Sequence, residues 1–176
     1  MGVADASWVR QHIRAIADYP KPGVTFRDIT PLLGDAAAFG RAVDDLVTCF
    51  HDVAVDRVVG IESRGFILAA PVAYRLRAGF VPVRKTGKLP WAVAREEYDL
   101  EYGTDKLEIH RDAIHPGENI LVVDDVLATG GTAAATGRLI ETLGGVIVGF
   151  GFLIEIGELK GRLRLPDKRV ASLTVF

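Results

Sequence analysis

Residues 122–132 combine residue types that could bind a phosphate group. The segment reads VVDDVLATGGT, an apolar run followed by two acids and a turn of small residues. The turn ends in Ala128, Thr129, Gly130, Gly131 and Thr132, which lead into a predicted helix. Small residues let an anion approach the backbone N–H groups closely, and a helix N-terminus favours negative charge. The pattern predicts a phosphate cup, but not a nucleotide P-loop, which needs a lysine after its glycines.

The two acids beside this cup, Asp124 and Asp125, suit a different part of a ligand. Two carboxylates repel a phosphate placed on them, whereas they can hold hydroxyl groups or a hydrated metal ion. A ribose 5-phosphate meets both demands, with its phosphate in the cup and its sugar hydroxyls on the acids. Either acid alone could equally cap a helix after a core strand, but the complete string favours a ligand site.

Two other segments carry groups that could hold a second anion. Residues 62–64 (Glu-Ser-Arg) follow a predicted buried strand and open a helix, so the backbone, the Ser63 hydroxyl and the Arg64 guanidinium can face a ligand. Sequence alone leaves open a salt bridge between Arg64 and Glu62 or Asp28. Residues 84–88 place three cations in five positions, which fits either a solvated basic edge or an anion site.

The string at residues 122–132 closely resembles the phosphoribosyl-pyrophosphate signature of the type I phosphoribosyltransferases. Its Ala-Thr-Gly-Gly-Thr ending is the form usual in the members that use adenine. Residues 19–33, 60–66, 83–90 and 100–103 match further segments of that family in the same order. The resemblance therefore covers nearly the whole chain, and several ordered motifs are more specific than one.

The resemblance implies an enzyme that transfers the 5-phosphoribosyl group of phosphoribosyl pyrophosphate to N9 of adenine, giving AMP and pyrophosphate. It implies Mg²⁺ bound through pyrophosphate and ribose oxygens, without an all-protein metal site. It implies a homodimer in which Arg84 reaches across the interface, and a cis peptide near Glu62–Ser63. The expected pyrophosphate ligands are Glu62, Ser63, Arg64, Arg84, Lys85 and Lys88.

The resemblance also assigns the base site and the catalytic residues. Phe26 is expected to stack on the purine, main-chain groups around Thr25 and Arg27 to read its edge, and Leu127 to cover its other face. Glu101 is the implied general acid/base, and Tyr102 helps enclose the reacting centre. From the residues alone, Phe26 could be core packing and Glu101 a solvated loop acid. The rival functions are transfer to another purine and non-catalytic, regulatory binding of phosphoribosyl pyrophosphate.

The elements that must position these residues are predicted from apolar periodicity. Strands are expected at residues 57–61, 80–83, 106–110, 119–123, 146–154 and 170–175, and helices at 35–50, 65–77 and 132–143. Ser7 is expected to cap a first helix in which Val9, Ile13 and Ile16 share one face. Alternating strands and helices predict an α/β protein with a mostly parallel central sheet flanked by helices, the type I phosphoribosyltransferase fold.

The chain organisation follows from length and loop content. The 176 residues predict one domain spanning 1–176, with a small N-terminal hood at about 1–34. Residues 86–104 form a polar stretch with no clear period, which predicts either a flexible lid loop or a mobile surface insertion. The net charge of −2 and the single cysteine favour a cytoplasmic protein with no nucleic-acid or membrane partner.

Overall fold

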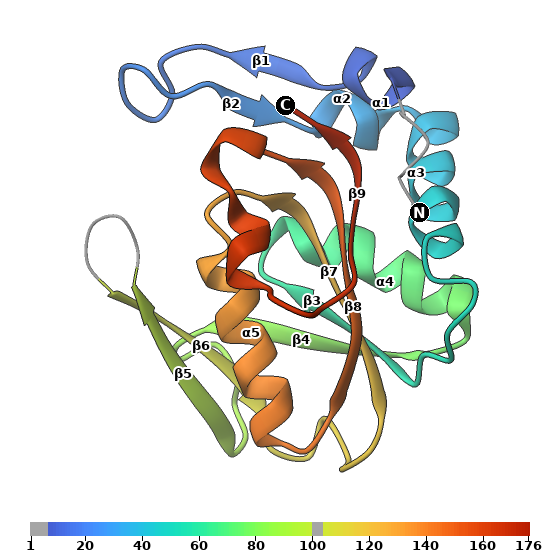
Figure 1. Cartoon of the computed structure of the whole chain (residues 1–176), viewed down its shortest axis with the longest axis vertical. Coiled ribbons are helices and arrows are strands. Elements are labelled where there is room, and N and C mark those ends of the chain that lie inside the picture. The colour runs from blue at the N-terminus through green and yellow to red at the C-terminus, as the bar shows by residue number, and fades with distance from the viewer. Residues whose placement is uncertain (1–6, 100–103) are drawn as a thin grey trace.

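The computed structural model describes residues 7–99 and 104–176, and over these residues one large sheet forms the centre of the molecule (Figure 1). Its seven strands lie in the order β5-β6-β4-β3-β7-β8-β9. Strands β4, β3, β7, β8 and β9 run parallel, while β5 and β6 are antiparallel additions. The strands are β3 (Arg57–Ile61), β4 (Gly79–Lys85), β5 (Val93–Asp99), β6 (Thr104–His110), β7 (Asn119–Leu127), β8 (Val146–Glu155) and β9 (Val170–Val175). The predicted α/β class is confirmed.

Helices cover both faces of the sheet and divide the core in two. Helices α3 (Ala36–Thr48) and α4 (Arg64–Leu76) share one cluster of buried side chains with Val58 and Leu121, and α5 (Gly131–Thr142) shares the other with Val59 and Val122. Successive strand residues face opposite sides of a sheet, so these neighbours separate between the two clusters. Apolar runs without alternation are typical of such doubly covered parallel strands.

The N-terminal segment differs from the single long helix expected there. Helix α1 (Ser7–Gln11) ends early, and β1 (Arg14–Ile16) pairs antiparallel with β2 (Phe26–Asp28), with Ile16 opposite Phe26. A short helix, α2 (Thr30–Gly34), follows. The expectation that Ile13 and Ile16 continue the first helix is wrong, because pairing with β2 overrides a helical period of only three apolar residues.

This hairpin lies across one end of the sheet, close to the end of β9 (Figure 1). The Phe176 ring packs between two guanidinium groups, with the Arg10 and Arg27 Cζ atoms 4.9 and 4.1 Å from its centroid. Arg10 also donates from Nε to Thr174 Oγ1 at 3.1 Å. Cation–π stacking and hydrogen bonding therefore fix the described part of the hood, from residue 7 to about residue 34, to the end of the last strand.

The expected lid segment, residues 86–104, is not structureless in its described part. Strand β5 pairs with β6 in register from Val93 opposite His110 to Asp99 opposite Thr104. The period was hidden because one inward position, Glu96, is charged and meets Arg138 of α5, whose Nε lies 2.5 Å from Glu96 Oε1. Residues 100–103 connect the two strands and lie outside the described residues.

The helices are short: none in the described part of the chain has the length and apolar content to cross a membrane. Asp35 caps helix α3 as predicted, since its carboxylate accepts hydrogen bonds from the N–H groups of Ala37 and Ala38, both at 2.9 Å.

Two glycines give a test of the packing. Gly149 is buried, and a Cβ there would overlap the fully buried Phe50 ring and lie 3.2 Å from Arg169 O. We expect Gly149→Ala to lower the free energy of unfolding by about 1–3 kcal/mol, the range for overpacking. Gly40, in helix α3, is exposed with open space around its Cβ position, so Gly40→Ala should raise that free energy by about 0.5–1 kcal/mol. Urea unfolding measures both, and equal effects would contradict the packing described here.

Candidate active site

The phosphate cup follows β7 directly and is supported by a segment that sequence reasoning missed. Gly130 has φ +80°, and α5 begins at Gly131. A Cβ on Gly161 would overlap Ala128 O and lie 2.9 Å from Leu127 Cδ1. Residues 157–164, which form two short 3₁₀ turns, therefore press against the backbone of the cup. Nothing in the local sequence around Gly161 indicated this contact, because it depends on residues more than 30 positions away.

The acid pair stands at the end of β7, where it meets the loop after β3. Asp124 Oδ1 accepts from the Asp125 N–H at 2.9 Å. Arg64 Nε lies 2.8 Å from Asp125 Oδ2 without being aligned as a hydrogen bond, so the contact is an ion pair. A Cβ on Gly65 would lie only 2.6 Å from Asp124 Oδ1, so the start of α4 presses on the first acid. Neighbouring parallel strands deliver both segments to one edge, the usual place for a ligand.

The environment of the two acids makes their charged forms costly. Burial among protein atoms, and then repulsion from Asp125, raise the pKa of Asp124 well above its usual value. Burial also raises the pKa of Asp125, although the Arg64 guanidinium opposes that rise. Two carboxyl groups with elevated pKa values at a strand edge are typical of a functional site rather than of a structural ion pair.

Arg64 connects the acid pair to the expected base site. Its Cζ lies 5.1 Å from the centre of the Phe26 ring, which is half-buried and meets Tyr19 edge-to-face at 5.3 Å. Of the partners left open for Arg64, neither Glu62 nor Asp28 is used, because the guanidinium faces Asp125. The expected cis peptide at Glu62–Ser63 is present.

The basic segment 84–88 is exposed from Lys85 to Lys88, and two of its cations converge on one acid. Glu62, whose side chain is 6% exposed, lies 3.0 Å from Arg84 Nε and 2.5 Å from Lys88 Nζ. Burial pushes the pKa of Glu62 upward, but hydrogen bonds from Lys88, the Lys85 backbone and Arg84 hold it below its usual value. The ionised Glu62 side chain therefore orients the Arg84 and Lys88 side chains. Because it is negatively charged, it does not bind an anion directly.

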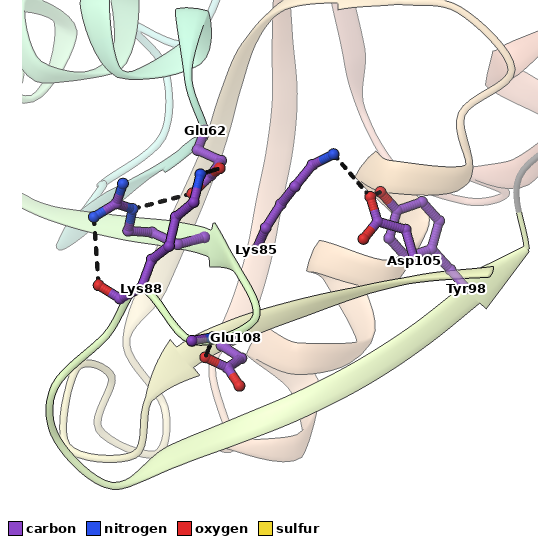
Figure 2. Close-up of polar contacts among 8 residues, drawn as sticks. Glu62, Lys85, Lys88, Tyr98, Asp105 and Glu108 are labelled. Atoms are coloured by element: carbon purple, nitrogen blue, oxygen red, sulfur yellow. Dashed lines mark hydrogen bonds and ion pairs between the residues drawn. The ribbon is translucent and has the colours of Figure 1, made fainter.

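A buried acid fixes the turn that carries these cations. Glu108 on β6 is 1% exposed, accepts from the Gly87 N–H at 3.0 Å and lies 2.6 Å from Arg95 Nε. Figure 2 shows Lys88 turned toward Glu62 and Lys85 turned toward Asp105, away from Lys88. The turn thus separates its cations between two acids.

The remaining predicted residues are placed as follows. Thr25 is exposed and Arg27 is half-buried against Phe176, so both lie in the hood near Phe26. Leu127 is buried in the core cluster on the α5 face, and its contact with a base stays a prediction. Glu101 and Tyr102 lie outside the described residues.

Metal binding can draw on hard oxygen donors at this edge. Among residues 7–99 and 104–176, no three His, Cys, Asp or Glu side chains gather into a metal-binding group. Asp124 and Asp125 nevertheless fit Mg²⁺, which takes one or two carboxylates and completes its shell with water and substrate oxygens.

Comparison with known proteins defines the class. The family model for the phosphoribosyl transferase domain matches residues 34–176. The crystal structure of adenine phosphoribosyltransferase from Thermoanaerobacter pseudethanolicus superposes with a TM-score of 0.94 at 47% identity, covering 97% of this chain and 99% of that one. The adenine phosphoribosyltransferase of Acidothermus cellulolyticus is 58% identical over 94% of this chain and 93% of its own length.

A third relative carries ligands. The adenine phosphoribosyltransferase of Saccharomyces cerevisiae, solved with adenine and an imino-altritol bisphosphate, superposes with a TM-score of 0.90 at 38% identity, covering 97% of this chain and 98% of that one. The fold and these matches define a type I phosphoribosyltransferase. Within that class, the chain belongs to the adenine phosphoribosyltransferase family.

The buried acid pair predicts a stability change of unusual sign. A carboxyl group whose pKa is raised by folding removes stability as pH rises from its unfolded pKa, about 4, through its folded pKa. Asp124→Asn keeps the oxygen that accepts from Asp125 N–H and removes the charge. Since Asp124 keeps some solvent contact, we expect a gain of about 1 kcal/mol in unfolding free energy at pH 7, at the low end for a buried polar group.

The pH dependence separates this effect from general stabilisation. The gain should be small near pH 4 and should grow toward pH 7, while carboxyl groups away from the pair cancel in the difference. Asp125→Asn is the matched control, because it loses the ion pair with Arg64 and should gain less. Urea unfolding at several pH values measures the difference, and a gain that shrinks with rising pH would show that Asp124 is not strained by its charge.

Proposed function

We propose that the protein transfers the 5-phosphoribosyl group of phosphoribosyl pyrophosphate to N9 of adenine, releasing AMP and pyrophosphate in purine salvage. The observation that supports this most directly is the acid pair and cup at the end of β7, beside the Arg64 loop at the end of β3. One edge of the sheet then holds a 5-phosphate, sugar hydroxyls and a pyrophosphate in sequence. The ligands named for the yeast relative, adenine and a bisphosphate, fit the same division of the site.

The co-substrate is held in three places. The cup, Ala128 to Thr132, binds the 5-phosphate through backbone N–H groups and the Thr129 hydroxyl. Asp124 and Asp125 accept hydrogen bonds from ribose hydroxyls. Ser63, Arg64, Lys85 and Lys88, with the backbone at Glu62, receive the pyrophosphate. Asp124 and Asp125 would also hold a hydrated Mg²⁺, which would supply further charge neutralisation.

The reaction exchanges one bond at ribose C1. Adenine N9 forms the new C–N bond while the C–O bond to pyrophosphate breaks, and the electrons of that bond leave with the pyrophosphate. If C–O cleavage runs ahead, the ribose gains oxocarbenium character, as in glycoside chemistry. Arg64 and the lysines stabilise the leaving anion, and the N9 proton passes to Glu101 directly or through another ring nitrogen.

The base is held under the hood, and the hairpin tip closes the site. Phe26 stacks on the purine while main-chain groups at Thr25 and Arg27 read its edge, with Leu127 on the other face. Residues 86–104 act as the lid, and its tip carries Glu101 and Tyr102. Closure excludes the water that would otherwise capture the developing cation.

We also propose a homodimer with Arg84 close to the partner subunit. On α4 and β4, Ile67, Tyr74 and Phe80 are 42, 82 and 38% exposed, an apolar group that suits burial against a second copy. Arg84 Cζ lies 6.0 Å from the centre of the Phe66 ring, which itself meets Phe80, so Arg84 borders this surface. Light scattering gives the molar mass that tests the dimer.

We also propose a cytoplasmic location, which accords with the single half-buried cysteine.

The function predicts which bases are used. With labelled phosphoribosyl pyrophosphate and Mg²⁺, adenine should yield AMP, while hypoxanthine and guanine should react with a kcat/KM lower by about 10²-fold or more. Each mismatched donor or acceptor on a buried base edge costs about 1–3 kcal/mol. Equal kcat/KM with hypoxanthine would show that the enzyme is not selective for adenine and would support transfer to another purine. Binding of the co-substrate without product from any base would leave a regulatory role.

Glu101 should act in the transition state rather than in binding. We expect Glu101→Gln to lower kcat and kcat/KM together by about 10²–10⁴-fold, with little change in KM, as for a general acid/base group. Glu97→Gln is the control, because Glu97 is exposed on β5 of the same hairpin and pairs with Lys106 at 3.0 Å. If both variants lose activity equally, Glu101 contributes only charge to the lid, and the acid/base assignment is wrong.

A further inference from the structure

A chain of polar contacts near the tip of the β5–β6 hairpin joins Lys85 to the phosphate cup. Lys85 Nζ lies 3.0 Å from Asp105 Oδ2, the Tyr98 hydroxyl donates to the same oxygen at 3.4 Å, and Thr132 Oγ1 donates to the Tyr98 hydroxyl at 3.4 Å. Figure 2 shows Lys85 extended toward Asp105, beside Tyr98. We propose that Asp105 and Tyr98 are positioning residues, which place Lys85 for the pyrophosphate and hold the Thr132 side chain so that its backbone N–H faces the 5-phosphate of one co-substrate molecule. This inference rests on the proposed function.

Lys85 needs such a partner more than its neighbours do. Its side chain is 55% exposed and carries four rotatable bonds, whose ordering costs up to about 2 kcal/mol when a ligand binds. Arg84 and Lys88 are already fixed on Glu62. Asp105 restricts Lys85 in the same way, and is itself held by the Lys106 N–H, which donates to Asp105 Oδ1 at 2.8 Å.

Tyr98 connects the two anion sites because both of its hydroxyl roles are in use. The residue is 7% exposed, so an unpaired hydroxyl there would be costly. It donates to Asp105 and accepts from Thr132, which lies in the last position of the cup. Burial raises the pKa of Tyr98, which keeps the hydroxyl protonated and able to donate.

The charges of the Lys85–Asp105 pair reinforce each other. The hydrogen bond to Asp105, and then its charge, raise the pKa of Lys85. Burial pushes the pKa of Asp105 upward, but the hydrogen bond from Lys85 and the backbone N–H of Lys106 hold it below its usual value. Lys85 thus stays a full cation at neutral pH, which a pyrophosphate ligand requires.

A purely structural brace would make different predictions from a positioning role. If these contacts only braced β5, β6 and α5, their loss would lower the stability of the hairpin and would weaken the use of both substrates alike. Simple neutralisation of Lys85 by Asp105 would weaken anion binding, so its removal would tighten the binding of pyrophosphate. A positioning role predicts the opposite sign, weaker pyrophosphate binding without Asp105, at unchanged global stability.

The test compares Asp105→Asn, Tyr98→Phe and the control Glu97→Gln, which also breaks an acid–lysine pair on this hairpin. Calorimetric titration with pyrophosphate and Mg²⁺ measures binding without turnover, and steady-state kinetics gives KM for each substrate. We expect Asp105→Asn to weaken pyrophosphate binding and raise KM for phosphoribosyl pyrophosphate by about tenfold, the scale of one charge-assisted hydrogen bond. Tyr98→Phe should show a smaller loss of the same kind. KM for adenine and the melting temperature should stay the same in Asp105→Asn and Tyr98→Phe. The control Glu97→Gln should match the wild type in every measurement.

A double-mutant cycle completes the test. If Asp105 acts through Lys85, then Asp105→Asn should add little to the loss caused by Lys85→Met, since the two contacts are one interaction. Tighter pyrophosphate binding by Asp105→Asn, additive losses in the cycle, or a parallel rise in KM for adenine would each overturn the inference. Failure of the proposed function is distinguishable, because the wild-type protein would then form no AMP while its pyrophosphate titration could still be read.

Discussion

The central constraint in this structure is that acids and anion-binding groups must share one edge of a sheet. Asp124 and Asp125 are adjacent, mostly enclosed, and next to the cup proposed for a phosphate. Arg64 faces one of them, and in the proposed function ribose hydroxyls or a metal ion meet the other. The order of the strands makes this possible: β3 and β7 are parallel neighbours, so the loop that carries Arg64 and the acid pair emerge side by side. Gly65 is required by the same arrangement, since a side chain there would collide with Asp124.

Much of this arrangement could be predicted from local sequence, and the rest depends on contacts that local sequence does not contain. The β-branched runs predicted β3 and β7, and parallel strands that end at a common edge bring the Arg64 loop to the acid pair. The pairing of Arg64 with Asp125 was not predicted, since Glu62 and Asp28 were the partners left open. Two elements were missed for the same physical reason. Ile16 fits a helical period as well as a strand, and only pairing with β2 decides between them. Glu96 breaks the apolar alternation of β5, and only its partner Arg138 explains a charge there. Gly161 shows its role only when its backbone meets the cup.

A second theme is that the site is nearly neutral before any ligand arrives. Its cations already face acids: Arg64 faces Asp125, Arg84 and Lys88 face Glu62, and Lys85 faces Asp105. Pairing removes repulsion between cations in the folded protein and fixes the directions of long side chains. Where Arg84 and Lys88 share Glu62, the pairing also limits how tightly these two cations can hold an anion, because each divides its attraction between that anion and the acid. Binding that holds substrate and transition state equally does not accelerate the reaction, so an enzyme that releases an anion loses nothing by that limit.

The contacts of the Phe176 ring with Arg10 and Arg27 determine when the hood can dock during synthesis of the chain. The hydrogen bond from Arg10 to Thr174 spans 164 positions, so the hood is anchored by contacts between the first and last parts of the sequence. Contacts of such separation close the largest loops and form late in folding. At roughly 5–20 residues per second, a ribosome needs on the order of 10–30 s between the synthesis of Arg10 and that of Thr174. During that interval the hood lacks the Phe176 ring and the Thr174 hydroxyl that hold it in the folded protein.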